Sequence, residues 1–140
     1  MSDRPMQFAI VDIETNGGPP TGANITEIAA ILHDGQREID RWVHLVKPAS
    51  PIPPGITRLT GIDDTMVADA PLFGELAPDF QAFLGDAVFV AHNVGFDLRY
   101  LQAAFKANGL HYNPRRLCTV RMSRKWIKGP QRYSLGALCA

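Results

Sequence analysis

The sequence contains few of the residues that bind metals through sulfur or ring nitrogen. It has two cysteines, Cys118 and Cys139, and four histidines, and none of these residues has the spacing of a zinc-ligand pair. Two cysteines are also too few for a disulfide framework. No run of 18 apolar residues occurs, and the first seven residues lack a signal-peptide pattern. We therefore expect no zinc site, no membrane span and a cytoplasmic location.

Acidic residues are missing from the last third of the chain. No Asp or Glu follows Asp97, whereas residues 98–140 contain nine Lys or Arg. Residues 1–97 carry all 14 acids and five bases, so a net charge of −9 is cancelled by +9 in the later residues. Such an asymmetry suggests a polyanionic partner. It would arise equally if the chain stopped before a further acidic segment.

The length of 140 residues and the hydrophobic share of 46% predict one globular domain, residues 1–140, with a sizeable core. Three segments are predicted to be β-strands: Phe8–Ile13, which is apolar on both faces like a central strand, Ile25–Leu32 and Ile39–Val46. Asp34-Gly35 marks a hairpin turn, within a loop longer than two residues, between the second and third strands. A short buried strand is expected at 87–91.

Two helical segments are predicted in the middle of the chain. Gly55–Ile62 should form one short helical turn that ends at Gly61. A longer helical region should begin at Asp69–Pro71, because the large apolar residues that follow have a period of 3.6. Pro78 lies inside this region and is expected to break or restart the helix.

Further helices are predicted toward the C-terminus. The first covers Val94–Asn108, with Asn93 as its N-cap and Gly109 just past its end. Others are expected near Thr119–Ile127 and from Ser134 onward.

Three carboxylates form the main candidate site. Asp12 and Glu14 are two residues apart at the end of a strand, so their side chains share one face. Asp97 lies in the first turn of a predicted helix, on the stripe that faces the core. These ligands are hard oxygens, which select Mg²⁺ or Mn²⁺, and sites with two such ions break phosphodiester bonds. The alternative interpretations are a helix-start acid for Asp97 and a solvated loop margin for Asp12 and Glu14.

Two motifs around these carboxylates resemble those of the DEDD 3′–5′ exonucleases. The first is Asp12-Ile13-Glu14-Thr15, and the second is His92-Asn93-Val94-Gly95-Phe96-Asp97. The chain is most similar to the proofreading exonuclease (epsilon) subunit of bacterial DNA polymerase III, and the resemblance covers nearly all of it. The resemblance implies a ribonuclease H-like α/β fold with a mixed five-stranded sheet flanked by helices.

The resemblance also implies the roles of particular residues. Asp12, Glu14 and Asp97 would be the catalytic carboxylates and would bind two Mg²⁺ or Mn²⁺ ions in the complete site. The reaction would release nucleoside 5′-monophosphates from a 3′ end. The residues expected to contact or surround the terminal nucleotide are Thr15, Asn16, Leu59, Thr60, Ile62, His92, Asn93 and Phe96.

The chain departs from the family pattern in one respect. Members end with a third motif, His-x4-Asp or Tyr-x3-Asp, which supplies a base and a fourth carboxylate. Tyr133 is followed four positions later by Ala137, and the residue five positions after His111 is Arg116. We therefore expect an exonuclease domain that is incomplete at its C-terminus, with a truncated terminal helix and with weak activity or none.

Three functions remain open on the sequence alone. The first is a metal-dependent exonuclease on DNA in proofreading or repair, and the second is the same chemistry on RNA ends. The third is a non-catalytic module that binds nucleic acid or a polymerase. The expected partners are single-stranded or frayed 3′ ends and a DNA polymerase or larger nuclease, with no membrane.

Overall fold

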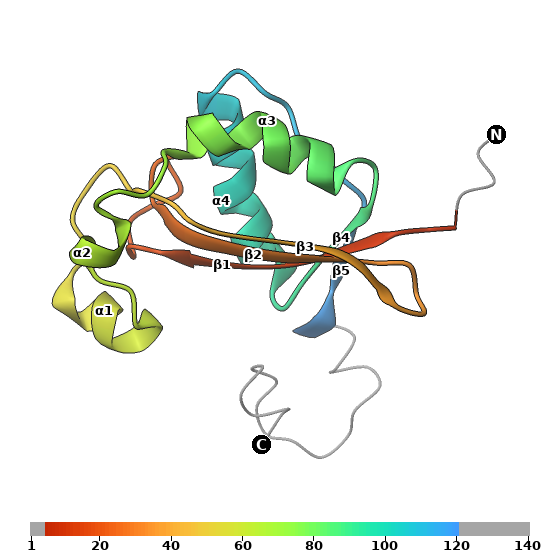
Figure 1. Cartoon of the computed structure of the whole chain (residues 1–140), viewed down its shortest axis with the longest axis horizontal. Helices are drawn as coiled ribbons and strands as arrows, with labels where there is room; N and C mark the ends of the chain where they lie inside the picture. The colour runs from red at the N-terminus through yellow and green to blue at the C-terminus, as the bar shows by residue number, and fades with distance from the viewer. Residues whose placement is uncertain (1–4, 121–140) are drawn as a thin grey trace, which may run out of the picture.

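The computed structural model describes residues 5–120, which form a five-stranded sheet with helices packed on it (Figure 1). The strand order is β3-β2-β1-β4-β5, in which β1 pairs antiparallel with β2 and parallel with β4. The predicted mixed α/β sheet is therefore confirmed. The elements are β1 (Phe8–Thr15), β2 (Ile25–His33), β3 (Glu38–Leu45), α1 (Pro54–Thr60), α2 (Asp64–Val67), α3 (Phe73–Leu84), β4 (Val88–Ala91), α4 (Val94–Ala107) and β5 (Arg116–Cys118).

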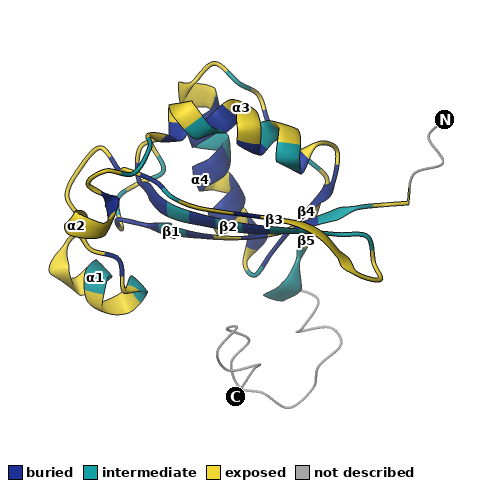
Figure 2. Cartoon of the chain, in the orientation of Figure 1, coloured by how far each residue is buried: buried dark blue, intermediate teal, exposed yellow. Residues whose placement is uncertain are grey.

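The main core lies between the sheet and the helices α3 and α4, which cover one of its faces (Figures 1 and 2). Alternate residues of β1 face this core, so Val11 and Ile13 are buried. In α4, Leu101 and Phe105 are fully buried one turn apart. The opposite face of the sheet has apolar and charged residues, and Ile10 is exposed there. No helix within residues 5–120 is long and apolar enough to cross a membrane.

The hairpin between β2 and β3 has a four-residue loop, as the prediction of a loop longer than two residues requires. The Asp34 carboxylate accepts hydrogen bonds from the backbone N–H groups of Gln36 and Arg37, at 2.8 and 2.9 Å. Gly35 has a φ of 95°, which a residue without Cβ adopts at no steric cost. The turn chemistry thus fixes the register of these two strands.

The helices α1 and α2 form a small lobe with a hydrophobic cluster of its own, separate from the main core. This second cluster contains Ile52, Ile62 and Val67. As predicted, α1 ends at Gly61, which has a φ of 79°. The short helix α2 was not predicted, although the side chain of Asp63 caps it by accepting from the N–H of Met66.

One prediction about the helices was wrong, and another was confirmed in part. Pro78 does not break α3, which runs without interruption from Phe73 to Leu84. Pro78 and Gly74 are both exposed, so water can hydrate the Gly74 carbonyl that lacks a helical partner. Asn93 is the N-cap residue of α4, as predicted, but its side chain makes no cap hydrogen bond. Its φ of 69° instead turns the chain from β4 into α4 within two residues.

The predictions near the C-terminus have mixed outcomes. The strand β5, which pairs with β4, was not assigned to any segment in advance, because three residues are too few for a periodic pattern. Most of the helix expected at Thr119–Ile127, and all of the helix expected from Ser134, lie outside the described residues.

Replacing Pro78 with Ala should stabilise the protein by about 1 to 2 kcal/mol. Alanine restores the hydrogen bond to the Gly74 carbonyl, and this gain outweighs the loss of proline's effect on the unfolded chain. Urea denaturation followed by circular dichroism would measure the change. The reverse substitution at exposed Ala82, Ala82→Pro, should destabilise the protein. A loss of stability in Pro78→Ala would contradict this account.

Candidate active site

Asp12 and Glu14 lie where β1 extends beyond its neighbour β4. The two strands pair only from Phe8 to Ile10 of β1, whereas the pairing of β1 with β2 continues to Thr15. Because Val11 and Ile13 point into the core, Asp12 and Glu14 point to the other face. The end of β1 therefore presents two carboxylates at a place where β4 no longer covers its edge.

Asp97 reaches this same place from the first turn of α4. Its side chain is buried, with 5% exposed, and its Oδ2 accepts a hydrogen bond of 3.3 Å from the backbone N–H of Ile13. The prediction that Asp97 faces inward is confirmed. Since Ile13 lies between Asp12 and Glu14 in the chain, this bond brings the third carboxylate next to the first two.

The three carboxylates destabilise one another's charged forms. Burial raises the pKa of Asp97 to about 7, and the negative charges of Asp12 and Glu14 contribute to the increase. Burial also raises the pKa of Glu14, with further contributions from Asp12 and Glu27, and partial burial raises the pKa of Asp12. Within residues 5–120, none of these acids forms an ion pair. Among residues 5–120, no cation therefore compensates the charge at this site.

Glu27 is a fourth acid at this site. Its Cα lies opposite that of Glu14 in the antiparallel pairing of β1 and β2. Its charge adds to the rise in the pKa of Glu14, so the structure links Glu27 to the carboxylate cluster. The register of the two strands is the signal that would have located it.

The donors suit a divalent cation in chemistry and in charge. Carboxylate oxygens are the ligands that Mg²⁺ and Mn²⁺ prefer, and a cation would relieve the repulsion that raises these pKa values. Within residues 5–120, however, no three His, Cys, Asp or Glu side chains converge closely enough to hold a metal ion. The three carboxylates therefore influence one another's charge without forming a closed set of ligands among the described residues.

Two of the residues predicted to contact a nucleotide, Thr15 and Asn16, are buried. The Asn16 amide donates to Ser50 Oγ at 2.9 Å, and its carbonyl oxygen accepts from the amide of Asn24 at 3.1 Å. Thr15 Oγ1 accepts from the N–H of Gly17. Their side chains are committed to these internal bonds, so a nucleotide contact at this position would use the backbone.

The three residues predicted to contact the nucleotide in and after α1 differ in how accessible their side chains are. Leu59 is 81% exposed, the largest exposure among the exposed large apolar side chains of residues 5–120. Thr60 bonds within the segment, donating to the Ile56 carbonyl and accepting from the N–H of Ile62. Ile62 itself is buried in the second cluster. Of the three, only Leu59 has a side chain free to contact a ligand.

The second predicted motif surrounds Asp97 at the start of α4. Phe96 is 40% exposed, and its ring lies 4.9 Å from that of Tyr100. Asn93 is exposed. His92 is half-buried, with Nδ1 2.7 Å from Thr119 Oγ1, which joins it to the residue after β5. Phe96 and Asn93 are thus accessible next to the carboxylates, and His92 is held by the fold.

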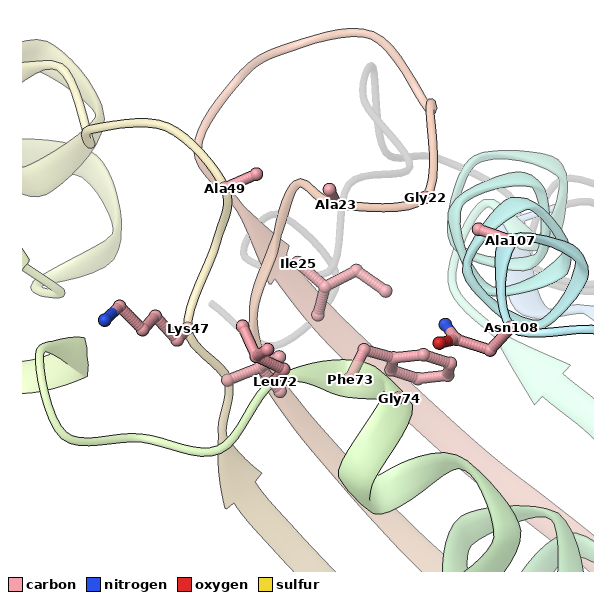
Figure 3. Close-up of a pocket in the computed structure, with 11 residues that line it drawn as sticks. Gly22, Ala23, Ile25, Lys47, Ala49, Leu72, Phe73, Gly74, Ala107 and Asn108 are labelled. Carbon is pink, nitrogen blue, oxygen red and sulfur yellow. The ribbon is translucent and has the colours of Figure 1, made fainter.

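A separate cavity of about 240 Å³ lies between the start of α3, the end of α4 and the segments around Gly22 and Lys47 (Figure 3). Ile25 and Phe73 form part of its wall. None of the predicted site residues lines it. The candidate site is therefore the open end of β1 and not this cavity.

Comparison with known proteins gives a consistent result. Residues 9–140 match the family model described as Exonuclease (RNase_T). The chain is 38% identical over 132 residues to the PolC-type DNA polymerase III of Caldanaerobacter subterraneus, covering 94% of this chain and 9% of that protein. It is 33% identical over 132 residues to the 3′–5′ exonuclease DinG of Staphylococcus epidermidis, covering 94% of this chain and 15% of that protein.

A solved structure is similar as well. Exonuclease X in complex with 5′-overhanging duplex DNA is 30% identical to the chain, with a TM-score of 0.73, and the match covers 94% of this chain and 70% of that one. The chain spans about a fifth or less of the curated relatives it matches. The similarity therefore concerns one domain of those larger proteins.

Without metal, the free energy of unfolding should fall as the pH rises from about 4 to about 7. Asp97 has a pKa of about 7 in the folded protein against 3.8 for an ordinary Asp, so the folded state binds more protons in this window. The stability present below pH 4 is consequently lost as the pH rises through 7. The Asp97→Asn variant cannot ionise at this position. Its free energy of unfolding should therefore be higher than that of the wild type by roughly 2 to 4 kcal/mol at pH 8, and by much less at pH 4.5.

Urea denaturation in EDTA at several pH values would measure both profiles. Asp86→Asn, on the exposed turn before β4, controls for the loss of one carboxylate. Parallel profiles for Asp97→Asn and the wild type would contradict the raised pKa of Asp97.

Proposed function

The chain belongs to the exonuclease (RNase_T) family of DEDD 3′–5′ exonucleases, and on this basis we propose that it hydrolyses the terminal phosphodiester of DNA 3′ ends with Mg²⁺ or Mn²⁺. The products would be nucleoside 5′-monophosphates. The single observation that supports this most is the electrostatic coupling of Asp12, Glu14 and Asp97 near the end of β1, with no ion-pair partner for any of them within residues 5–120.

In this proposal the three carboxylates hold the metal ions. Asp97 is fixed by the Ile13 N–H, while Asp12 and Glu14 are free to adjust around a cation. Two ions bound there would lower the pKa of the attacking water and stabilise the leaving oxygen. The raised pKa values imply that metal binding releases protons near neutral pH, so metal affinity should rise with pH.

The exposed apolar side chains on either side of the carboxylates would hold the terminal nucleotide. Leu59 would wedge against the terminal base, and Phe96 would offer a ring for stacking. His92 and Asn93 would shape the pocket, and the backbone at Thr15 and Asn16 would contact the sugar and phosphate. Ile62 would support α1, which carries Leu59, because it is buried in the cluster against which Ile56 packs.

DNA is the proposed substrate because the relatives include a polymerase and an exonuclease, and one similar structure holds duplex DNA. A DNA polymerase or a larger nuclease is the proposed partner, in proofreading or repair, within the cytoplasm. We expect the 140-residue chain to be slow. No Asp or Glu follows Asp97, and a positioned base usually contributes about 10²- to 10⁴-fold to the rate.

Hydrolysis is best tested with 5′-labelled single-stranded DNA and the protein in excess, so that a slow reaction is still visible. The wild type should shorten the strand from its 3′ end with Mn²⁺ or Mg²⁺, and EDTA should stop it. Asp12→Asn and Asp97→Asn should each lose at least about 100-fold in rate, because a metal ligand contributes several kcal/mol to the transition state.

Glu38→Gln is the matched control, since Glu38 is an exposed acid on β3 paired with Arg41. Its rate should equal that of the wild type. A matched RNA oligonucleotide measured alongside should react more slowly. Faster cleavage of RNA would reassign the substrate, and binding without any cleavage would favour a non-catalytic module.

Metal binding can be measured without a substrate. Mn²⁺ should raise the melting temperature of the wild type, corresponding to about 2.7 kcal/mol at 100 times the dissociation constant. Asp12→Asn should lose most of this increase, because it removes a ligand and half of the charge that faces Asp97. An equal increase in both proteins would refute the assignment of Asp12 as a ligand.

A further inference from the structure

The loop between β1 and β2, residues 16–24, begins immediately after Glu14 and Thr15 and is closed at its base by a buried amide pair. The Asn16 N–H donates to the Asn24 carbonyl at 2.9 Å, and the Asn24 side chain donates to Asn16 Oδ1 at 3.1 Å. The side-chain amide of Asn16 donates to the hydroxyl and to the backbone carbonyl of Ser50. These bonds fix the two ends of the loop.

The middle of the loop is held against α4 at two points. The Tyr100 hydroxyl donates to the Gly18 carbonyl, and Tyr100 is 8% exposed. Gly22 has a φ of +100°, and a Cβ added to it would lie 2.9 Å from the Ala103 carbonyl oxygen. Tyr100 lies one helical turn after Asp97, so the helix that carries the third carboxylate also holds the loop.

The other side of the loop supports α1. A Cβ added to Gly17 would lie 2.9 Å from Ile56 Cδ1, so the loop and α1 are in direct contact. No residue of α1 is fully buried, and the same Ile56 that meets the loop also packs against the second cluster, so Ile56 links the loop to this helix. Leu59 projects from α1 with 81% of its surface exposed. The loop thus lies between the helix of Asp97 and the helix of Leu59.

We propose that Tyr100 is a positioning residue that sets the distance between Leu59 and the carboxylates by tying the 16–24 loop to α4. The inference rests on the proposed function, in which Leu59 holds the terminal nucleotide. The phenol acts only through its hydroxyl, because its ring would remain in place beside Phe96 after replacement by Phe. Loss of the bond lets the loop and α1 shift away from Asp97, and the terminal phosphate is then held less well for attack.

The experiment compares Tyr100→Phe, Leu59→Ala and the double variant in single-turnover cleavage of single-stranded DNA. Each single variant should lower the rate at saturating protein by about 5- to 10-fold, since a small misplacement of the substrate is costly. If Tyr100 acts through Leu59, the double variant should be no slower than Leu59→Ala by more than about twofold.

Tyr112→Phe is a close control. Tyr112 is also 8% exposed, and its hydroxyl has no hydrogen-bond partner within residues 5–120. Its variant should cleave at the wild-type rate. Tyr100→Phe should also keep the wild-type increase in melting temperature with Mn²⁺, because the carboxylates and the Ile13 bond are untouched. Loss of that increase would indicate a general structural role and would overturn the proposal.

Two further outcomes would also overturn it: an unchanged rate in Tyr100→Phe, or the same fold-loss from this substitution with and without Leu59. A wild-type rate in Leu59→Ala would show that Leu59 does not hold the terminal nucleotide, and the proposal for Tyr100 would then fail. In each of these cases Asp12-dependent cleavage would persist. Failure of the proposed hydrolysis is different, since cleavage would then be absent or indifferent to Asp12→Asn.

Discussion

The hydrogen bond from the Ile13 N–H to the Asp97 carboxylate determines how the rest of the site is arranged. Because β1 extends beyond the end of its pairing with β4, this N–H has no partner on β4. A buried donor without an acceptor would lower the stability of the fold. A carboxylate on α4 satisfies it and joins the helix to the strand. The same bond places a third negative charge beside two others. The fold therefore creates an electrostatic imbalance that a proton or a cation must relieve.

The position of this imbalance explains why the fold and the chemistry are connected. Asp12 and Glu14 follow from the alternation of a strand, and Asp97 follows from the helical stripe that also buries Leu101. Neither pattern alone requires a site. They make one because the parallel pairing of β1 with β4, and the two-residue turn at Asn93, bring the start of α4 to the end of β1. Topology thus converts two ordinary burial patterns into a cluster of acids.

The hydrophobic periodicity of the sequence predicted the long strands and helices of this fold. It did not predict the elements that are short or that depend on tertiary contacts. The strands of the β1–β2–β3 meander and the helix α4 have enough residues to show their period. The strand β5 has three residues, and its pairing with β4 depends on the tertiary fold. Pro78 was misjudged because its cost depends on whether the freed carbonyl meets water. Likewise, Asn16 and Ile62 were expected around the terminal nucleotide, but their burial could be seen only once the loop and the lobe were placed.

The lobe of α1 and α2 has its own small cluster of Ile52, Ile62 and Val67, apart from the core beneath α3 and α4. Substitutions on its outer surface leave the main core and the three carboxylates unchanged. During evolution, such a lobe can diversify under weaker constraint than the sheet. The surroundings of the carboxylates can in this way change through a segment that contributes none of the three acids.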